Sequence, residues 1–168
     1  MSDVPLEVAN PIESLMADLS TCLCSQIISD GLPSLCFCGV VPGNAVALDY
    51  VGECDDEVCG MAWVRLMAAY PASTIGQAST RPGNCSTGIG IDVEIGIIRC
   101  FDAGDGQTPP DPAELTAAAA LANADMLAMW RAVSCCRRSK DFVIGSYVPY
   151  GPEGGVYGGI LPASILVL

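Results

Sequence analysis

The chain of 168 residues carries 19 acidic residues against 7 basic ones, for a formal net charge of −12, and it contains no histidine. This balance excludes a basic patch for nucleic-acid recognition, and the lack of histidine removes the commonest general base and all histidine-containing metal sites. The length fits one well-buried domain. We therefore predict a single domain over residues 1–168, with residues 1–10 as a flexible N-terminal arm.

No segment of the sequence resembles a targeting or membrane-spanning signal. The N-terminal residues are acidic where a secretory signal would be basic, and no apolar run approaches the roughly 20 residues that a membrane helix needs. We expect a protein that is made and used inside the cell, with no membrane partner.

The chain has ten cysteines, and in a chain without a secretory signal the default is buried free thiols. A zinc site is the alternative. The residues that it would draw on are Cys36, Cys38, Cys54, Cys59, Cys85 and Cys100. Cys54 and Cys59 lack the two-residue spacing of a common zinc knuckle, so we expect no metal and no cofactor.

A first helix is predicted to begin at Asn10, because a capping side chain, a first-turn proline and Glu13 follow one another there. Apolar residues then recur at helical spacing, at Ile12, Leu15, Met16, Leu19, Leu23 and Ile27. Gly31 and Pro33 end the helix.

Two strands, Leu35–Val41 and Ala45–Val51, are predicted to form a hairpin around Pro42-Gly43-Asn44. A third strand is predicted over Met61–Tyr70. Pro71–Thr87 is polar and rich in Gly, Ser and Thr, which predicts a long loop with a contact role.

The segment Gly88–Asp102 is predicted to be the central strand. Five β-branched residues fall on one side of it, at Ile89, Ile91, Val93, Ile95 and Ile97. Asp92 and Glu94 fall on the other side, which we interpret as a solvated acidic face rather than a catalytic carboxylate pair.

A second helix is predicted from Asp111-Pro112-Ala113-Glu114 onward. Its apolar stripe comprises Leu115, Ala118, Ala119, Ala122, Met126, Met129, Trp130 and Val133. We expect Met129, Trp130 and Val133 to pack on the central strand. Four of the seven basic residues gather near the end of this helix, at Arg131, Arg137, Arg138 and Lys140. This basic cluster is interpreted either as complementation of the helix dipole or as a contact for an acidic partner.

Phe142–Tyr150 and Gly155–Leu168 are predicted to be the last two strands, joined by a Gly-rich turn. Strands in succession between two helices predict an α+β domain. In it, a mostly antiparallel sheet carries both helices on one side. No combination of residues forms a recognisable catalytic site, so we expect a non-enzymatic protein.

Several blocks of the chain, in this order and spacing, resemble tail-terminator proteins of long-tailed phages that infect actinobacteria. The blocks are Cys59–Arg65, Val93–Cys100, the alanine-rich helix ending at Cys135-Cys136, and the glycines of Gly154–Gly159 before a terminal strand. The likeness covers roughly Leu35–Leu168. The terminal strand departs from the pattern at Ile160 and Pro162, which favours an edge position for it.

The resemblance implies a structural virion protein, assembled in the host cytoplasm, that forms a hexameric ring at the head-to-tail junction. Such a ring caps the tail tube of the major tail protein and offers a docking surface to a head-tail stopper or connector. DNA would pass through its lumen unbound, and carboxylates such as Asp92 and Glu94 would line the lumen or an outer surface. We expect the cluster of Arg131, Arg137, Arg138 and Lys140 to form an interface with an acidic segment of an adjacent subunit or of the neighbouring ring.

Two alternatives remain open. One is another connector ring, a stopper or an adaptor, and the other is a small cysteine-rich zinc-binding module.

Overall fold

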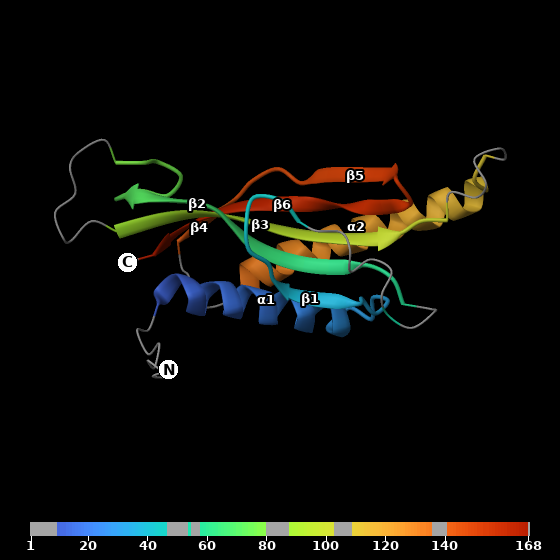
Figure 1. The fold of residues 1–168 in the computed structure, drawn as a ribbon, viewed down its shortest axis with the longest axis horizontal. Helices are drawn as coiled ribbons and strands as arrows, with labels where there is room; N and C mark the ends of the chain where they lie inside the picture. Colours follow the sequence, from blue (N-terminus) through green and yellow to red (C-terminus); the bar gives the residue numbers. More distant parts are fainter. Residues whose placement is uncertain are drawn as a thin grey trace, which may run out of the picture.

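The structure is a computed structural model that describes residues 10–46, 54, 58–79, 88–102, 109–135 and 141–167. Two helices and six strands follow one another in these parts of the chain (Figure 1). In chain order they are α1 (Pro11–Ser29), β1 (Phe37–Val40), β2 (Met61–Ala72), β3 (Gly88–Cys100), α2 (Pro112–Cys135), β4 (Phe142–Ile144), β5 (Val148–Glu153) and β6 (Val156–Val167).

The six strands form one sheet in the order β1-β2-β3-β6-β4, and β5 also pairs with β6. All pairings are antiparallel except that of β1 with β2, which is parallel. The chain is therefore an α+β fold with a mostly antiparallel sheet, as the order of predicted elements indicated.

The strand β3 lies at the centre of this sheet, as predicted, between β2 and β6. Ile91, Val93, Ile95 and Ile97 are at most 1% exposed and belong to the core that both helices cover. Ile89, predicted to share that buried side, is 41% exposed. The core therefore begins at Ile91.

The first helix begins and is buried as its sequence predicts. The Asn10 side chain accepts a hydrogen bond from the Ile12 amide at 3.1 Å, and Pro11 occupies the first helical position. Five of the six predicted apolar residues are buried, and Ile12 is partly buried against the core. This stripe fixes α1 on the core side of the sheet.

The second helix is present as predicted, but its buried face is different. Its core contacts come from small and apolar residues of the C-terminal half, Ala128, Met129, Ala132 and Val133. Trp130 is 48% exposed, so the prediction that it packs on β3 is wrong. Ala128 and Ala132 explain this difference, because they let the helix approach the sheet on a face that excludes the indole.

The N-terminal half of α2 is largely exposed, although it consists mostly of alanine and leucine. In Figure 1 its first turns extend beyond the end of β5. The predicted stripe therefore packs against the sheet only in its second half.

The sheet face opposite the helices carries a second, smaller cluster. Met61, Trp63 and Ile98 are buried there, with Phe37 and Ile160 packed against them. Gly96 lies beside Trp63 in the β2–β3 register, and a Cβ at Gly96 would overlap the indole. The glycine therefore makes room for the tryptophan on this face.

The terminal strand β6 is a central strand, so the predicted edge position is wrong. It pairs with β3 on one side and with β4 and β5 on the other. The Pro162 carbonyl accepts a hydrogen bond from the Gly145 amide at 2.8 Å, where the chain passes between β4 and β5. This side of β6 therefore faces the connection between those two strands. The missing N–H of Pro162 points to that same side and interrupts no ladder bond with β3.

Other predicted segments are shorter, divided or outside the described residues. The strand predicted over Phe142–Tyr150 is divided into β4 and the start of β5. Most of the predicted strand Ala45–Val51 lies outside the described residues, and the described partner of β1 is β2. The predicted loops 71–87 and 102–112 also lie partly outside them.

The prediction that most cysteines are free thiols is wrong. Seven of the described cysteines are disulfide-bonded, and the described free thiol is the exposed Cys135. Three bridges have both partners in the described residues: Cys24–Cys38, Cys36–Cys54 and Cys59–Cys100. The first joins α1 to β1, and the last joins the residues at the start of β2 and the end of β3.

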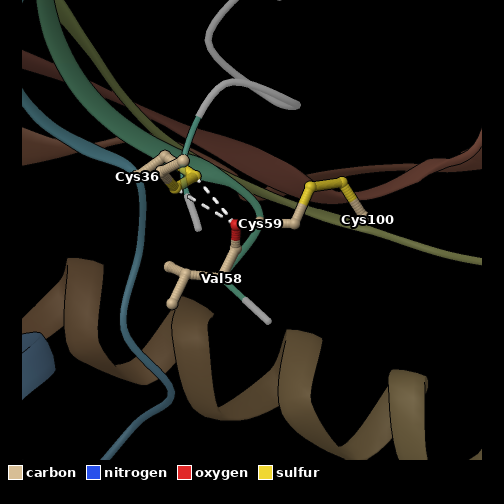
Figure 2. Close-up of a disulfide and its surroundings, with 5 residues drawn as sticks. Cys36, Val58, Cys59 and Cys100 are labelled. Carbon is tan, nitrogen blue, oxygen red and sulfur yellow. Dashed lines mark hydrogen bonds between the residues drawn. A yellow bond between two sulfur atoms is a disulfide. The ribbon is translucent and has the colours of Figure 1, made fainter. Parts of the chain in front are cut away.

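Two of these bridges lie on either side of Val58 (Figure 2). The Cys36 and Cys54 sulfur atoms are 3.0 and 3.1 Å from the Val58 carbonyl oxygen, and the next residue, Cys59, bonds to Cys100. A thiol can donate a weak hydrogen bond to such an oxygen, whereas a disulfide cannot. These sulfur atoms are paired with one another, which leaves no thiolate among them for zinc.

We expect the pair of substitutions Cys59→Ala and Cys100→Ala to lower the free energy of unfolding by about 2–5 kcal/mol. The bridge closes a sequence separation of 41 residues, and its removal frees the unfolded chain. Urea denaturation measures the change, and Cys135→Ala, which removes the exposed free thiol, serves as the control. A double variant as stable as the control would contradict the bridge.

Candidate functional site

A buried ion pair joins the sheet to α2. The Arg99 guanidinium on β3 donates to both carboxylate oxygens of Asp125, at 2.7 and 2.8 Å, and the residues are 4% and 0% exposed. A third bond, of 3.0 Å, runs from Arg99 to the Pro33 carbonyl between α1 and β1. A bidentate pair of this kind fixes geometry as well as charge. Arg99 is therefore a structural group that connects three parts of the fold.

Two tyrosines lie near this pair. Burial, followed by the Asp125 charge, raises the pKa of Tyr147, whose hydroxyl donates to the Gly158 carbonyl at 2.9 Å. Burial raises the pKa of Tyr157 as well, although the Arg99 charge opposes the rise. Both tyrosines are therefore neutral hydrogen-bonding groups at neutral pH, not bases.

Glu94 is buried, so its predicted place on a solvated acidic face is wrong. It is 5% exposed and accepts from Arg65 at 2.7 and 2.8 Å and from the Trp63 indole at 2.9 Å. All three residues lie on the sheet face opposite the helices. The carboxylate is paired because an unpaired charge at this depth would cost several kcal/mol of desolvation.

Asp92 is half-buried and engaged in the same way. Its Oδ1 accepts from the Tyr70 hydroxyl at 3.0 Å and from the Ser164 hydroxyl at 2.7 Å. Asp92 and Glu94 are thus hydrogen-bonded to side chains of neighbouring strands, and neither is a free carboxylate of the predicted acidic face.

The predicted basic cluster is described only at Arg131. This residue is exposed and pairs with Asp30, at the C-terminal end of α1, at 2.9 Å. Arg137, Arg138 and Lys140 lie outside the described residues. The contact of Arg131 is thus within the subunit, and the interface role of the other three remains a prediction.

The described residues contain no group of three or more His, Cys, Asp or Glu side chains that could hold a metal ion. Neither α1 nor α2 combines the length and apolar character required to cross a bilayer. The two buried ion pairs in the described residues, Arg65–Glu94 and Arg99–Asp125, connect elements of the fold to one another.

The most unusual surface in the described part of the chain runs along α2. We call it the outer stripe, and its members recur at helical spacing and are exposed: Thr116, Ala120, Asn123, Leu127, Trp130 and Ser134. Leu127 is 47% and Trp130 48% exposed. Between Glu114 and Arg131 the single charged residue of the helix is Asp125, which is buried. A solvent-facing helix surface normally carries charges, so this stripe has the composition of an interface.

Two cavities border the strand β5. One, of about 250 Å³, lies on the sheet face opposite the helices and includes Trp63, Arg65, Glu94, Val148 and Tyr150 in its lining. The other, of about 220 Å³, lies between the N-terminal half of α2 and β5, and the alanines of α2 line it.

Sequence reasoning missed both buried ion pairs. Arg65 and Glu94 face each other only because β2 and β3 are antiparallel in a register that pairs these two residues. The sequence indicated only weakly that Asp125 and Arg99 would be paired, since each is an isolated charge in an apolar segment. A lone charge in a core-facing position requires a partner, but the sequence does not identify that partner.

We expect Arg99→Met to lower the free energy of unfolding by about 3–5 kcal/mol, because Asp125 would stay buried and unpaired. Adding Asp125→Leu should recover much of this loss, since no isolated charge then remains. The control is Arg131→Met, which breaks an exposed pair worth about 0–1 kcal/mol. Chemical denaturation of the three variants measures the effect, and equal losses for Arg99→Met and Arg131→Met would contradict it.

No family model matches the chain, and no curated protein shows a significant match to it.

Proposed function

We propose that this protein is a non-enzymatic virion component that assembles into a ring, a hexamer, at the head-to-tail junction of a long-tailed phage. In this role it terminates the tail tube and gives the connector a docking surface. The tail assignment rests on the resemblance of the sequence blocks described above. The self-association rests on the outer stripe of α2.

The outer stripe carries the proposal because of the charge of the whole chain. Copies with a net charge of −12 repel one another, so contact between them requires a surface without that charge. The outer stripe is such a surface, with Leu127 and Trp130 half-exposed in its C-terminal half. Tryptophan is among the side chains that contribute most to protein interfaces.

The acidic surplus has a use in such a ring. Carboxylates that line a channel repel the phosphates of passing DNA, so the DNA slides without being held. Asp92 and Glu94 do not supply this charge, since both are engaged within the sheet. Other acidic residues of the chain would provide it.

The disulfides fit a particle that leaves the cell. Cytosolic thiols are kept reduced during assembly, whereas a released virion meets an oxidising environment. The paired cysteines would then cross-link each subunit after the ring has formed.

The other three residues of the basic cluster would contact the neighbouring ring. Since Arg131 already pairs with Asp30, we assign docking on an acidic partner to Arg137, Arg138 and Lys140. Such a contact depends on salt concentration, because exposed charges are screened.

The test is the mass of the purified protein by native mass spectrometry, with negative-stain images of the same sample. We expect a closed ring of six copies for the unmodified chain. Leu127→Glu, which introduces a charge into the outer stripe, should reduce assembly by about tenfold or more while the circular dichroism spectrum of the folded subunit is kept. Ala117→Glu introduces the same charge at an exposed position of α2 outside the stripe and should leave assembly intact.

A chain that remains monomeric at every concentration would contradict the ring. One zinc ion per chain in the purified protein, with unfolding by a chelator, would instead favour the zinc-binding module.

A further inference from the structure

The cavity on the sheet face opposite the helices combines a buried ion pair with apolar side chains in one lining. The buried Arg65–Glu94 pair and Trp63 lie in its wall, and Val148 and Tyr150 of the edge strand β5, which are 50% and 42% exposed, form part of its lining. Apolar groups make up most of the remaining wall, including Ile98 and Ile160.

A polar group in this wall lacks a partner. Arg65 is 8% exposed and uses its Nε and Nη2 groups to bind Glu94. Its Nη1 is buried and has no acceptor among the residues that the structure describes. A buried donor without an acceptor costs about 1–3 kcal/mol, and more when it is charged. The cavity therefore favours an occupant that brings an oxygen acceptor or an aromatic face to the guanidinium.

The charge and size of the cavity narrow the class of occupant. Glu94 already neutralises Arg65, and the chain as a whole is strongly acidic, so an anionic ligand has no advantage here. The volume of about 250 Å³ is below the range of about 300–1,000 Å³ that is usual for cofactor and small-molecule pockets. An uncharged side chain with a large apolar body fits these limits.

The outer stripe of α2 presents a side chain of this kind. Trp130 is half-exposed, and the exposed Ser134 one helical turn further along carries a hydroxyl that accepts hydrogen bonds. No charged residue belongs to the stripe, so it can approach the cavity of another acidic copy without a local charge opposing it.

We propose that Trp130 of one subunit inserts into the cavity beside β5 of the next subunit, between Val148 and the Arg65–Glu94 pair. This inference rests on the proposed ring and identifies its lateral contact. The donor surface is on a helix, and the receiving surface is on the opposite face of the sheet. A contact between two different surfaces is head-to-tail, and such contacts close into rings when the rotation between subunits permits.

The experiment uses two substitutions that block opposite sides of the contact. Val148→Arg places a charge at the edge of the cavity, and Trp130→Ala removes the inserted side chain. Each variant alone should be monomeric by native mass spectrometry. A 1:1 mixture should give heterodimers and no larger species, because the tryptophan of the first variant can enter the intact cavity of the second.

The matched control is Val143→Arg, on the edge strand β4. Val143 is 55% exposed, pairs with β6 as Val148 does, and lies outside the cavity lining. This variant should form rings like the unmodified chain. Circular dichroism verifies that each variant is folded, and Tyr150→Arg, also in the cavity lining, repeats the test at a second position.

The outcomes separate the two claims. If the unmodified chain forms rings and Val148→Arg and Tyr150→Arg also form them, the cavity is not the contact, although the ring stands. If Trp130→Ala alone prevents rings, the tryptophan meets another surface, and the inference is again overturned. If the unmodified chain forms no rings, the proposed function itself fails.

Discussion

The buried pair of Arg99 and Asp125 is the interaction on which the arrangement of layers depends. It ties the central strand to α2, and the third bond of Arg99, to the Pro33 carbonyl, ties both to the segment between α1 and β1. Apolar contacts alone would allow α2 to slide along the sheet, since alanines supply much of its buried face. A bidentate ionic contact has one geometry, so it sets the position of the helix. That position in turn leaves Trp130 and Leu127 facing outward.

The sheet separates two different chemistries. On the helix side, the odd-numbered residues of β3 from Ile91 to Ile97 belong to the apolar core, and the next of them, Arg99, is charged. On the other side, Glu94 is enclosed by Arg65 and Trp63, and Gly96 gives the indole its room. The sheet face opposite the helices is therefore not a solvated acidic face. It carries a buried ion pair and a cavity.

The elements with strong local signals were predictable from the sequence. The cap at Asn10, the alternation of β3 and the helical stripe of α1 each follow from periodicity and end chemistry, which act over a few residues. The contacts of Glu94 were not predictable, because Arg65 and Glu94 meet only through the register of two strands. Trp130 was misplaced for a related reason: periodicity gives the apolar side of a helix, but the small residues Ala128 and Ala132 decide which part of it touches the sheet. The pairing of the cysteines likewise depends on the fold rather than on spacing.

The bridge between Cys59 and Cys100 has a further effect on the centre of the sheet. The strands β2 and β3 are consecutive in the chain, with the connecting segment after Ala72 at one end and this disulfide at the other. The two strands and their connections thus form a closed covalent circle of backbone and sulfur. A hairpin ordinarily frays from its open end, and here the disulfide closes that end. Separation of β2 from β3 would then begin away from the disulfide, at the end beside Ala72 or at the irregularity between Leu66 and Ala68, where pairing is already interrupted. Amide exchange in this pair should consequently be slowest at the end that the disulfide closes.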